Sequence, residues 1–87
     1  MNEFDQKLYN EYTKFLNYLK DKYKLIDERD KIDFNKYMYN YNNNITEGQK
    51  ELGKQLEQND HDRTQLGNKI KNIELKISNI LNKYKFL

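Results

Sequence analysis

The second half of this 87-residue chain carries mostly apolar residues at alternating steps of four and three. The repeat runs from Ile45 to Leu87, through six heptads without a slip. A sustained repeat of 3.5 residues is typical of a helix in a left-handed coiled coil. It predicts a long helix that packs along a partner helix. The repeat consists of Ile45, Gln49, Leu52, Leu56, Asn59, Arg63, Leu66, Ile70, Ile73, Ile77, Ile80, Tyr84 and Leu87.

The first half of the chain has a different spacing. Large side chains, mostly apolar, recur at steps of four, four and three, an eleven-residue repeat of about 3.67 residues per turn. Such a repeat is typical of a nearly straight amphipathic helix. We expect its inward face to consist of Phe4, Leu8, Tyr12, Phe15, Leu19, Tyr23, Ile26, Asp30, Phe34, Tyr37 and Tyr41, with Met38 beside it.

Three consecutive asparagines, Asn42 to Asn44, separate the two patterns. Asparagine tolerates the left-handed backbone conformation that ends helices. Thr46 and Gln49 then have the spacing of a capping box, which predicts the start of a second helix. We therefore predict one helical domain over 1–87, with a first helix at about 3–41, a turn at 42–46 and a second helix at 47–86.

The polar segments favour a hairpin over the alternative, one continuous coiled-coil helix of about 130 Å. If the chain folds back at residues 43–44, the polar runs 27–31 and 59–63 lie opposite each other, with apolar stretches on both sides. The predicted fold class is therefore all-α, an antiparallel helical hairpin or coiled coil.

This hairpin would contain a polar layer within its seam, formed by Asp27 and Asp30 on one helix and Asn59 and Arg63 on the other. A buried, unpaired arginine is strongly destabilising, so we expect Arg63 to meet a carboxylate or to reach water. Polar residues inside a coiled-coil seam can fix the register of the helices or select a partner. The alternative is that both side chains simply reach solvent.

A second apolar row is predicted on the outer side of the first helix, where Tyr18, Leu25, Ile32 and Tyr39 follow one another at intervals of seven. Left exposed, such a row would form an adhesive ridge. We expect it to bind protein, either a second copy in a four-helix bundle or a different partner. On the second helix, Leu75 and Phe86 are expected to share an outward face, and Leu81 is expected beside the seam.

The residues that catalysis, metal binding or cofactor binding would require are missing or dispersed. The chain has no cysteine and one histidine. His61 stands between Asp60 and Asp62, and consecutive helical residues point in different directions, so no metal site is expected. The three glycines, Gly48, Gly53 and Gly67, match no phosphate-binding loop. We therefore expect no catalytic residue, metal or cofactor.

The basic residues are concentrated at the C-terminal end. Residues 1–60 carry ten basic and twelve acidic side chains, whereas residues 61–87 carry six basic and two acidic ones. Lysines interleaved with aromatic residues can hold phosphates and stack bases. Lysines late in a helix also complement its dipole without any ligand. The candidate nucleic-acid contacts are Lys69, Lys71, Lys76, Lys83 and Lys85.

Composition suggests an AT-rich genome, because Ala, Val, Pro, Cys and Trp are absent and lysine outnumbers arginine fourteen to two. A low-GC bacterium, its phages, or a similarly biased eukaryote or virus would fit. No apolar run approaches the roughly 18 residues of a membrane span, and the polar N-terminal segment does not resemble a secretory signal. We expect a cytoplasmic protein, in the host cytoplasm if it is viral.

The sequence thus favours a non-catalytic protein–protein interaction module, an assembly subunit or scaffold built on a coiled-coil hairpin. One alternative is a small phage or mobile-element inhibitor that binds a host enzyme or defence complex. Another is a basic accessory protein that binds nucleic acid. The partner is expected to be protein, as a homo-oligomer or a hetero-complex.

Overall fold

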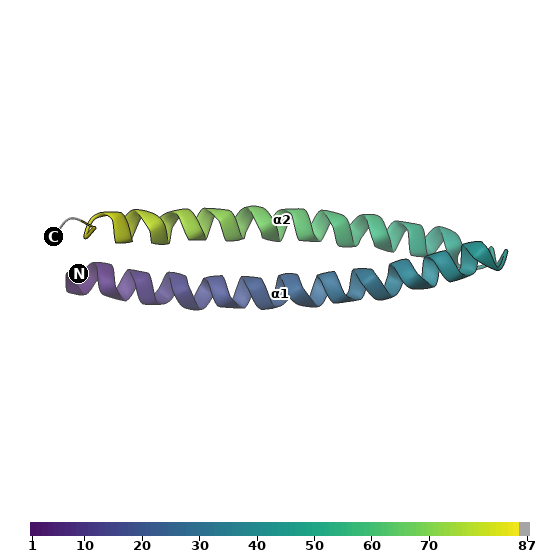
Figure 1. Ribbon diagram of the computed structural model, residues 1–87, viewed down its shortest axis with the longest axis horizontal. Coiled ribbons are helices and arrows are strands. Elements are labelled where there is room, and N and C mark those ends of the chain that lie inside the picture. The colour runs from purple at the N-terminus through teal and green to yellow at the C-terminus, as the bar shows by residue number, and fades with distance from the viewer. Residues whose placement is uncertain (86–87) are drawn as a thin grey trace.

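The chain forms two antiparallel helices joined by one turn (Figure 1). The computed structural model describes residues 1–85, with helix α1 at Glu3–Asn42 and helix α2 at Gln49–Asn82. The molecule is a thin rod of 64 × 17 × 14 Å. The predicted all-α antiparallel hairpin is confirmed, and the alternative of one continuous helix is wrong. Phe86 and Leu87, expected on the outer face and in the seam, lie outside the described residues.

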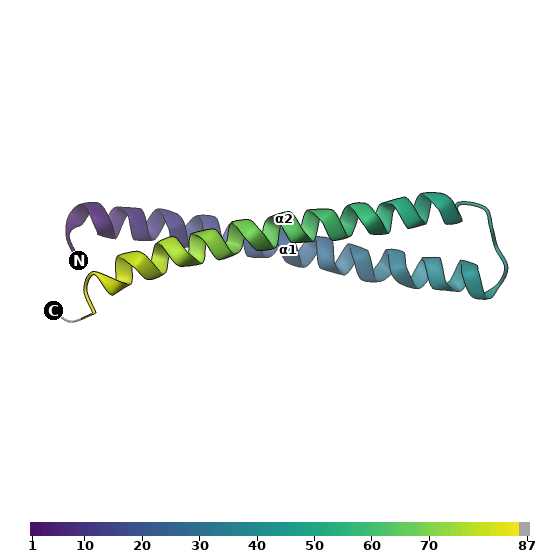
Figure 2. The same ribbon diagram turned by 90° about the horizontal axis from the view of Figure 1, so that it is seen from above.

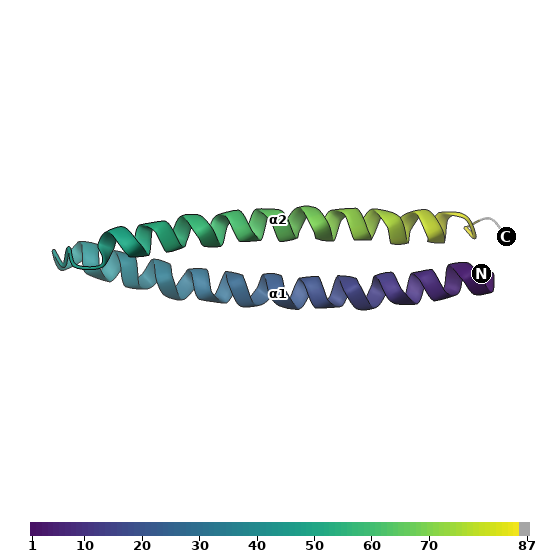
Figure 3. The same cartoon turned by 180° about the vertical axis from the view of Figure 1, so that it is seen from behind.

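The two helices contact each other along their length. They lie side by side when viewed from the front or from behind (Figures 1 and 3) and cross near the middle when viewed from above (Figure 2). Shallow crossing of this kind is how coiled-coil helices keep one seam in contact over many turns. A contact near the two ends of the chain, from the Asn2 backbone N–H to the Tyr84 hydroxyl at 3.2 Å, shows the antiparallel pairing directly.

Helix α1 begins at a side-chain cap. The Asn2 side-chain oxygen accepts a hydrogen bond from the Asp5 backbone N–H at 2.8 Å, which satisfies one of the amide groups left free in a first helical turn. Glu3 and Asp5 also place negative charge at the positive end of the helix dipole.

The turn uses the asparagines and one glycine. Asn43 donates from its side chain to the Tyr39 carbonyl at 2.8 Å, and Asn44 takes a left-handed conformation with φ of 57°. Gly48, with φ of 75°, is the residue before α2 and provides no side-chain cap. The predicted Thr46 cap is therefore wrong, because the chain reverses into α2 through a left-handed position that glycine adopts without strain.

The repeat predicted for α2 is confirmed by burial. Every position of the repeat from Gln49 to Tyr84 is partly or fully buried against α1. Ile45 is the exception: it lies in the turn and is exposed. The buried positions are Gln49, Leu52, Leu56, Asn59, Arg63, Leu66, Ile70, Ile73, Ile77, Ile80 and Tyr84.

The inward face predicted for α1 is partly wrong. Helices that wind around each other over their whole length must share a period, so α1 also follows the 3.5-residue repeat. The eleven-residue repeat placed Phe4, Phe15, Phe34 and Tyr41 inward, and all four are exposed, as is Met38. Apart from the half-exposed Tyr23, the residues facing α2 are partly or fully buried: Asp5, Tyr9, Tyr12, Leu16, Leu19, Ile26, Asp30, Asp33, Tyr37 and Asn40.

The apolar core is small and lies in the half of the rod that contains the chain ends. Among the described residues, the fully buried apolar side chains are Leu19, Ile73 and Ile80. The middle of the rod buries polar groups instead, with Asn59 only 1 % exposed. The hairpin therefore changes the chemistry of its seam along its length.

Candidate interaction surface and polar layer

Arg63 is the centre of the polar layer in the middle of the seam. Its Nη1 lies 3.1 Å from an oxygen of Asp27 and 3.1 Å from an oxygen of Asp30, and its Nη2 lies 3.3 Å from Asp60 on its own helix. The structure thus brings together three of the four residues predicted for this layer. The expectation that Arg63 meets a carboxylate is confirmed, because it pairs with three of them.

Asn59, the fourth predicted member, has a different partner. Its side-chain amide donates to Asp33 at 2.9 Å, and its oxygen accepts from Gln55 at 2.8 Å. Sequence reasoning missed Asp33, although it lies three residues after Asp30 and so fits a 3.5-residue repeat. Because Asn59 is buried and hydrogen-bonded on both sides, it does not simply reach solvent.

The charges of the layer stabilise one another. The hydrogen bond from Arg63, with help from Lys31 at 3.4 Å, holds the pKa of Asp27 below its ordinary value although partial burial opposes this. The same carboxylates outweigh the opposite effect of burial and raise the pKa of Arg63. Asp27 and Arg63 are therefore both charged at neutral pH, and the hydrogen bonds of the layer are satisfied in this helix register.

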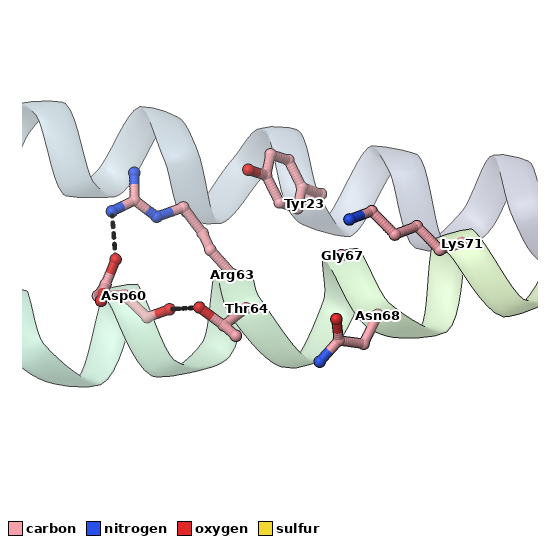
Figure 4. A pocket seen from close by; sticks show the side chains of 7 residues that line it. All are labelled: Tyr23, Asp60, Arg63, Thr64, Gly67, Asn68 and Lys71. Carbon is pink, nitrogen blue, oxygen red and sulfur yellow. Dashed lines mark hydrogen bonds and ion pairs between the residues drawn. The ribbon is translucent and has the colours of Figure 1, made fainter.

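A groove of about 370 Å³ runs beside the layer, between Tyr23 on α1 and the segment from Asp60 to Lys71 on α2 (Figure 4). It stays open because Gly67 has no side chain there. Asp60 is engaged by Arg63, and its backbone carbonyl accepts from the Thr64 hydroxyl at 3.0 Å (Figure 4). Asp60, Arg63 and Thr64 are committed to contacts within the hairpin, and we assign no ligand to the groove.

The predicted outer ridge is exposed. Tyr18, Leu25, Ile32 and Tyr39 are between 52 % and 67 % exposed and line up along α1 at intervals of seven residues. Phe4 belongs to the same row and is 73 % exposed. Leu8 and Phe15 lie beside this row, and the Phe15 and Tyr18 rings stack at 6.4 Å between centroids. We call the set the α1 stripe: Phe4, Leu8, Phe15, Tyr18, Leu25, Ile32 and Tyr39.

The second helix has far less exposed apolar surface. Within the described part of α2, its large exposed hydrophobic residues are Leu75 and Leu81. The remaining outward positions are polar or charged. The apolar surface left over by the hairpin is thus concentrated on α1. The sequence prediction missed Phe4, Leu8 and Phe15 as members because the eleven-residue repeat assigns them to the seam.

The candidate nucleic-acid lysines do not form one free basic patch. Lys83 pairs with Asp5 at 3.6 Å, and the Lys76 ammonium lies 5.7 Å from the centre of the Tyr12 ring. Lys71 borders the groove beside Gly67. Lys69 and Lys85 are exposed, with Lys69 on the opposite edge of α2 from Lys71.

A contact at the open end of the hairpin was not predicted. Asp5 is buried there, and it accepts a hydrogen bond from the Tyr84 hydroxyl. That hydrogen bond is the main reason why the pKa of Asp5 lies below its ordinary value. Burial raises the pKa and opposes this effect, and the charge of Lys83 lowers the pKa further. Asp5 had been passed over in favour of its apolar neighbour Phe4.

In residues 1–85, no group of three or more acidic or histidine side chains could hold a metal ion. His61 is exposed. No helix in this described range is long and apolar enough to cross a membrane. Comparisons with protein-family models, with curated proteins and with solved structures gave no match.

Proposed function

We propose that this protein is a non-catalytic protein–protein interaction module, an assembly subunit or scaffold that presents the α1 stripe on a stiff helical rod. The observation that carries the proposal is the exposure of one aligned apolar row on α1, while the outward face of α2 is polar apart from Leu75 and Leu81. Exposed apolar patches of this kind mark interaction sites in soluble proteins. The chemistry of the stripe is suited to binding rather than to catalysis.

The stripe has the composition of a binding surface. Burying one large apolar side chain contributes about 1.5–3 kcal/mol. Two of its residues, Tyr18 and Tyr39, are of a type enriched among the residues that dominate binding energy. The stripe also follows one continuous helix, so the residues are held in line and a partner need not order a loop on binding.

The polar layer supports the proposal from inside the rod. Arg63 and Asn59 have their hydrogen-bonding partners in this register of α1 and α2. A helix that slid by one turn would leave these groups unpaired, which costs free energy. The layer therefore supports a scaffold role, because it keeps the stripe at a fixed position relative to α2.

The basic end of α2 gives weaker support to a nucleic-acid-binding function. Lys83 and Lys76 already contact Asp5 and Tyr12 within the hairpin. No feature of the described residues favours this function over protein binding, and the stripe would have no part in it.

The proposed function is tested by capture from the source cell with the tagged protein, combined with its mass by light scattering. The double variant Ile32→Asp, Tyr39→Asp should lose its partner or its oligomer and keep its helical circular dichroism. The matched control is Asn35→Asp on the outward face of α1, which should behave as the wild type. Unchanged capture and unchanged mass in the double variant would contradict the proposal.

A further inference from the structure

Two rows of residues on the outer side of α1 have the spacing of a second coiled-coil seam. One row is Phe4, Glu11, Tyr18, Leu25, Ile32 and Tyr39, which we call the outer row. The other, which we call the flank row, is Leu8, Phe15, Lys22, Arg29 and Lys36, preceded at the same spacing by Met1 just before α1. Taken together, the rows alternate at steps of three and four, the same 3.5-residue period as the seam with α2. They are turned from that seam by about a quarter of the helix circumference.

The charges on these rows are unevenly distributed. The outer row is apolar except for Glu11. The flank row is apolar at Leu8 and Phe15 and basic in its last three positions, at Lys22, Arg29 and Lys36. The N-terminal half of the two rows is therefore apolar with one acid, whereas their C-terminal half alternates apolar and basic residues. Two copies of this surface have complementary charges only when the two α1 helices run antiparallel.

We propose that the α1 stripe binds the α1 stripe of a second copy of this chain, antiparallel, with the two-fold axis beside Lys20. Lys20 lies midway between Phe4 and Lys36, so this register pairs the two rows along the helical stretch from Phe4 to Tyr39, about 53 Å. This inference rests on the proposed function and names the partner of the same surface. In a two-fold interface each contact occurs twice.

In this register, every outer-row residue faces a flank-row residue, or Met1, of complementary chemistry. Glu11 faces Arg29 of the second copy, which pairs the single acidic residue of the outer row with a basic residue. Tyr18 faces Lys22, a contact between an aromatic ring and a cation. The same two residues already interact within one chain, where the Lys22 ammonium lies 4.7 Å from the Tyr18 ring centre. The remaining pairs are Met1 with Tyr39, Leu8 with Ile32, Phe15 with Leu25, and Phe4 with Lys36.

The alternatives are less complementary. A parallel pair in register would place Lys22, Arg29 and Lys36 against their own copies, and like charges facing each other are unfavourable. A shift of one heptad in one direction would place Phe4 against the asparagine turn. A shift in the other direction would leave Tyr39 beyond the end of the partner helix. The antiparallel register centred beside Lys20 is the one that pairs the full stripe.

A charge swap tests this pairing by sedimentation equilibrium of the full chain. Glu11→Lys and Arg29→Glu, made singly, should each weaken dimerisation at least about tenfold, because each places like charges together at two symmetric sites. The double variant Glu11→Lys, Arg29→Glu should dimerise nearly as tightly as the wild type. Glu28→Lys and Lys14→Glu make the same charge changes at exposed positions outside the stripe and should have little effect.

The single variants decide the orientation. In a parallel pair, positions 11 and 29 each face their own copies, so like charges oppose each other before and after either change, and the single variants would dimerise as the wild type. Single variants that dimerise as the wild type would therefore overturn the antiparallel pairing. A double variant that stays as weak as the single ones would overturn it as well, because the exchanged charges should pair again in the antiparallel dimer.

Cysteine pairing provides an independent measure, because the natural chain has no cysteine. Leu8→Cys and Ile32→Cys chains, mixed and oxidised, should form mostly the mixed disulfide, since the proposed pairing brings these positions face to face. Disulfides that join identical chains in preference to the mixed product, or the absence of any disulfide, would overturn the proposal. The products are identified by mass spectrometry.

The same measurements separate this inference from the proposed function. A wild-type chain that stays monomeric at up to about 1 mM overturns the dimer. If Ile32→Asp then abolishes capture of another protein, the stripe is still an interaction surface with a different occupant. If it changes neither mass nor capture, both proposals fall.

Discussion

The half of the hairpin that contains the chain ends and the middle of the hairpin bury the same seam with different chemistry. In the chain-end half, the buried apolar residues are Leu19 on α1 and Ile73 and Ile80 on α2. In the middle, Arg63 and Asn59 fill the equivalent seam positions and are held by aspartates of α1. The comparison separates two properties of a coiled coil, how strongly the helices associate and which register they adopt.

Apolar burial is nearly indifferent to register, because a shift of one heptad places another apolar residue in the same position. Hydrogen bonds and ion pairs are directional and depend on particular partners. The apolar half therefore supplies most of the stabilisation, and the polar layer specifies the alignment. Buried ion pairs in general add little net stability, which fits this division of roles.

The largest effect is expected in the apolar half. Leu19→Ala should destabilise the hairpin by about 2–5 kcal/mol, because it removes buried methyl groups and leaves a cavity. For a chain with such a small core, this loss should abolish most of the helical circular dichroism. Leu75→Ala removes the same atoms from an exposed position on α2 and should change stability by less than about 0.5 kcal/mol.

Leu19→Met keeps the result interpretable if the alanine variant does not fold. A methionine of similar volume should cost less than about 1.5 kcal/mol of unfolding free energy. In urea denaturation, the loss of stability should therefore increase from Leu75→Ala through Leu19→Met to Leu19→Ala. An equal cost for Leu19→Ala and Leu75→Ala would mean that the chain-end half is not the main source of stability.

A smaller effect is expected in the polar layer. Arg63→Leu should destabilise the hairpin by about 1–3 kcal/mol, because it leaves carboxylates of the layer close together without their cation. Asp30→Leu with Arg63→Leu places two apolar residues in facing seam positions and should recover at least part of that loss. Chemical denaturation of the two single variants and the double variant gives the coupling between the residues.

The comparison would need revision if Arg63→Leu were as stable as the wild type and kept the same register. In that case the three contacts of Arg63 would contribute neither stability nor alignment. Register can be followed separately, because a disulfide between cysteines introduced at Tyr12 and Ile77, near the Tyr12–Lys76 contact, should form efficiently only while the helices stay aligned.

The two halves of the chain also differ in how well their sequence predicted them. The 3.5-residue repeat of α2 predicted its buried face from Gln49 to Tyr84, because most positions are Leu or Ile and no competing apolar row exists. On α1 the apolar residues outnumber the seam positions. The eleven-residue repeat that they suggest led to Phe4, Phe34 and Tyr41, whereas the seam uses Asp5, Asp33 and Asn40 beside them.

The reason for that difference is that polar seam residues can be recognised only together with their partners. Asp33 is buried next to Asn59, and Asp5 next to Tyr84, and neither pairing is visible in the periodicity of one helix. The period of α2, applied to α1 through the antiparallel pairing, would have identified both. The outer ridge from Tyr18 to Tyr39 was recognisable because it needed only a regular spacing and no partner.

The smallest effect is expected at the open end, where Tyr84→Phe removes the hydroxyl that donates to Asp5. A pKa of Asp5 lowered from 3.8 means that its ionised form stabilises the folded state above about pH 4, and that this contribution disappears as the pH falls below that value. At neutral pH the variant should therefore melt a few degrees lower than the wild type. In strong acid, where Asp5 is protonated in both proteins, the two melting temperatures should converge.

Tyr12→Phe removes a hydroxyl that makes no hydrogen bond within residues 1–85, so the melting temperature of this control variant should follow that of the wild type across the titration. A difference between Tyr84→Phe and wild type that stayed constant from neutral pH to strong acid would show that the hydroxyl does not act through the Asp5 carboxylate. The hydroxyl would then act through its other partner, the Asn2 backbone N–H, which donates to it at 3.2 Å.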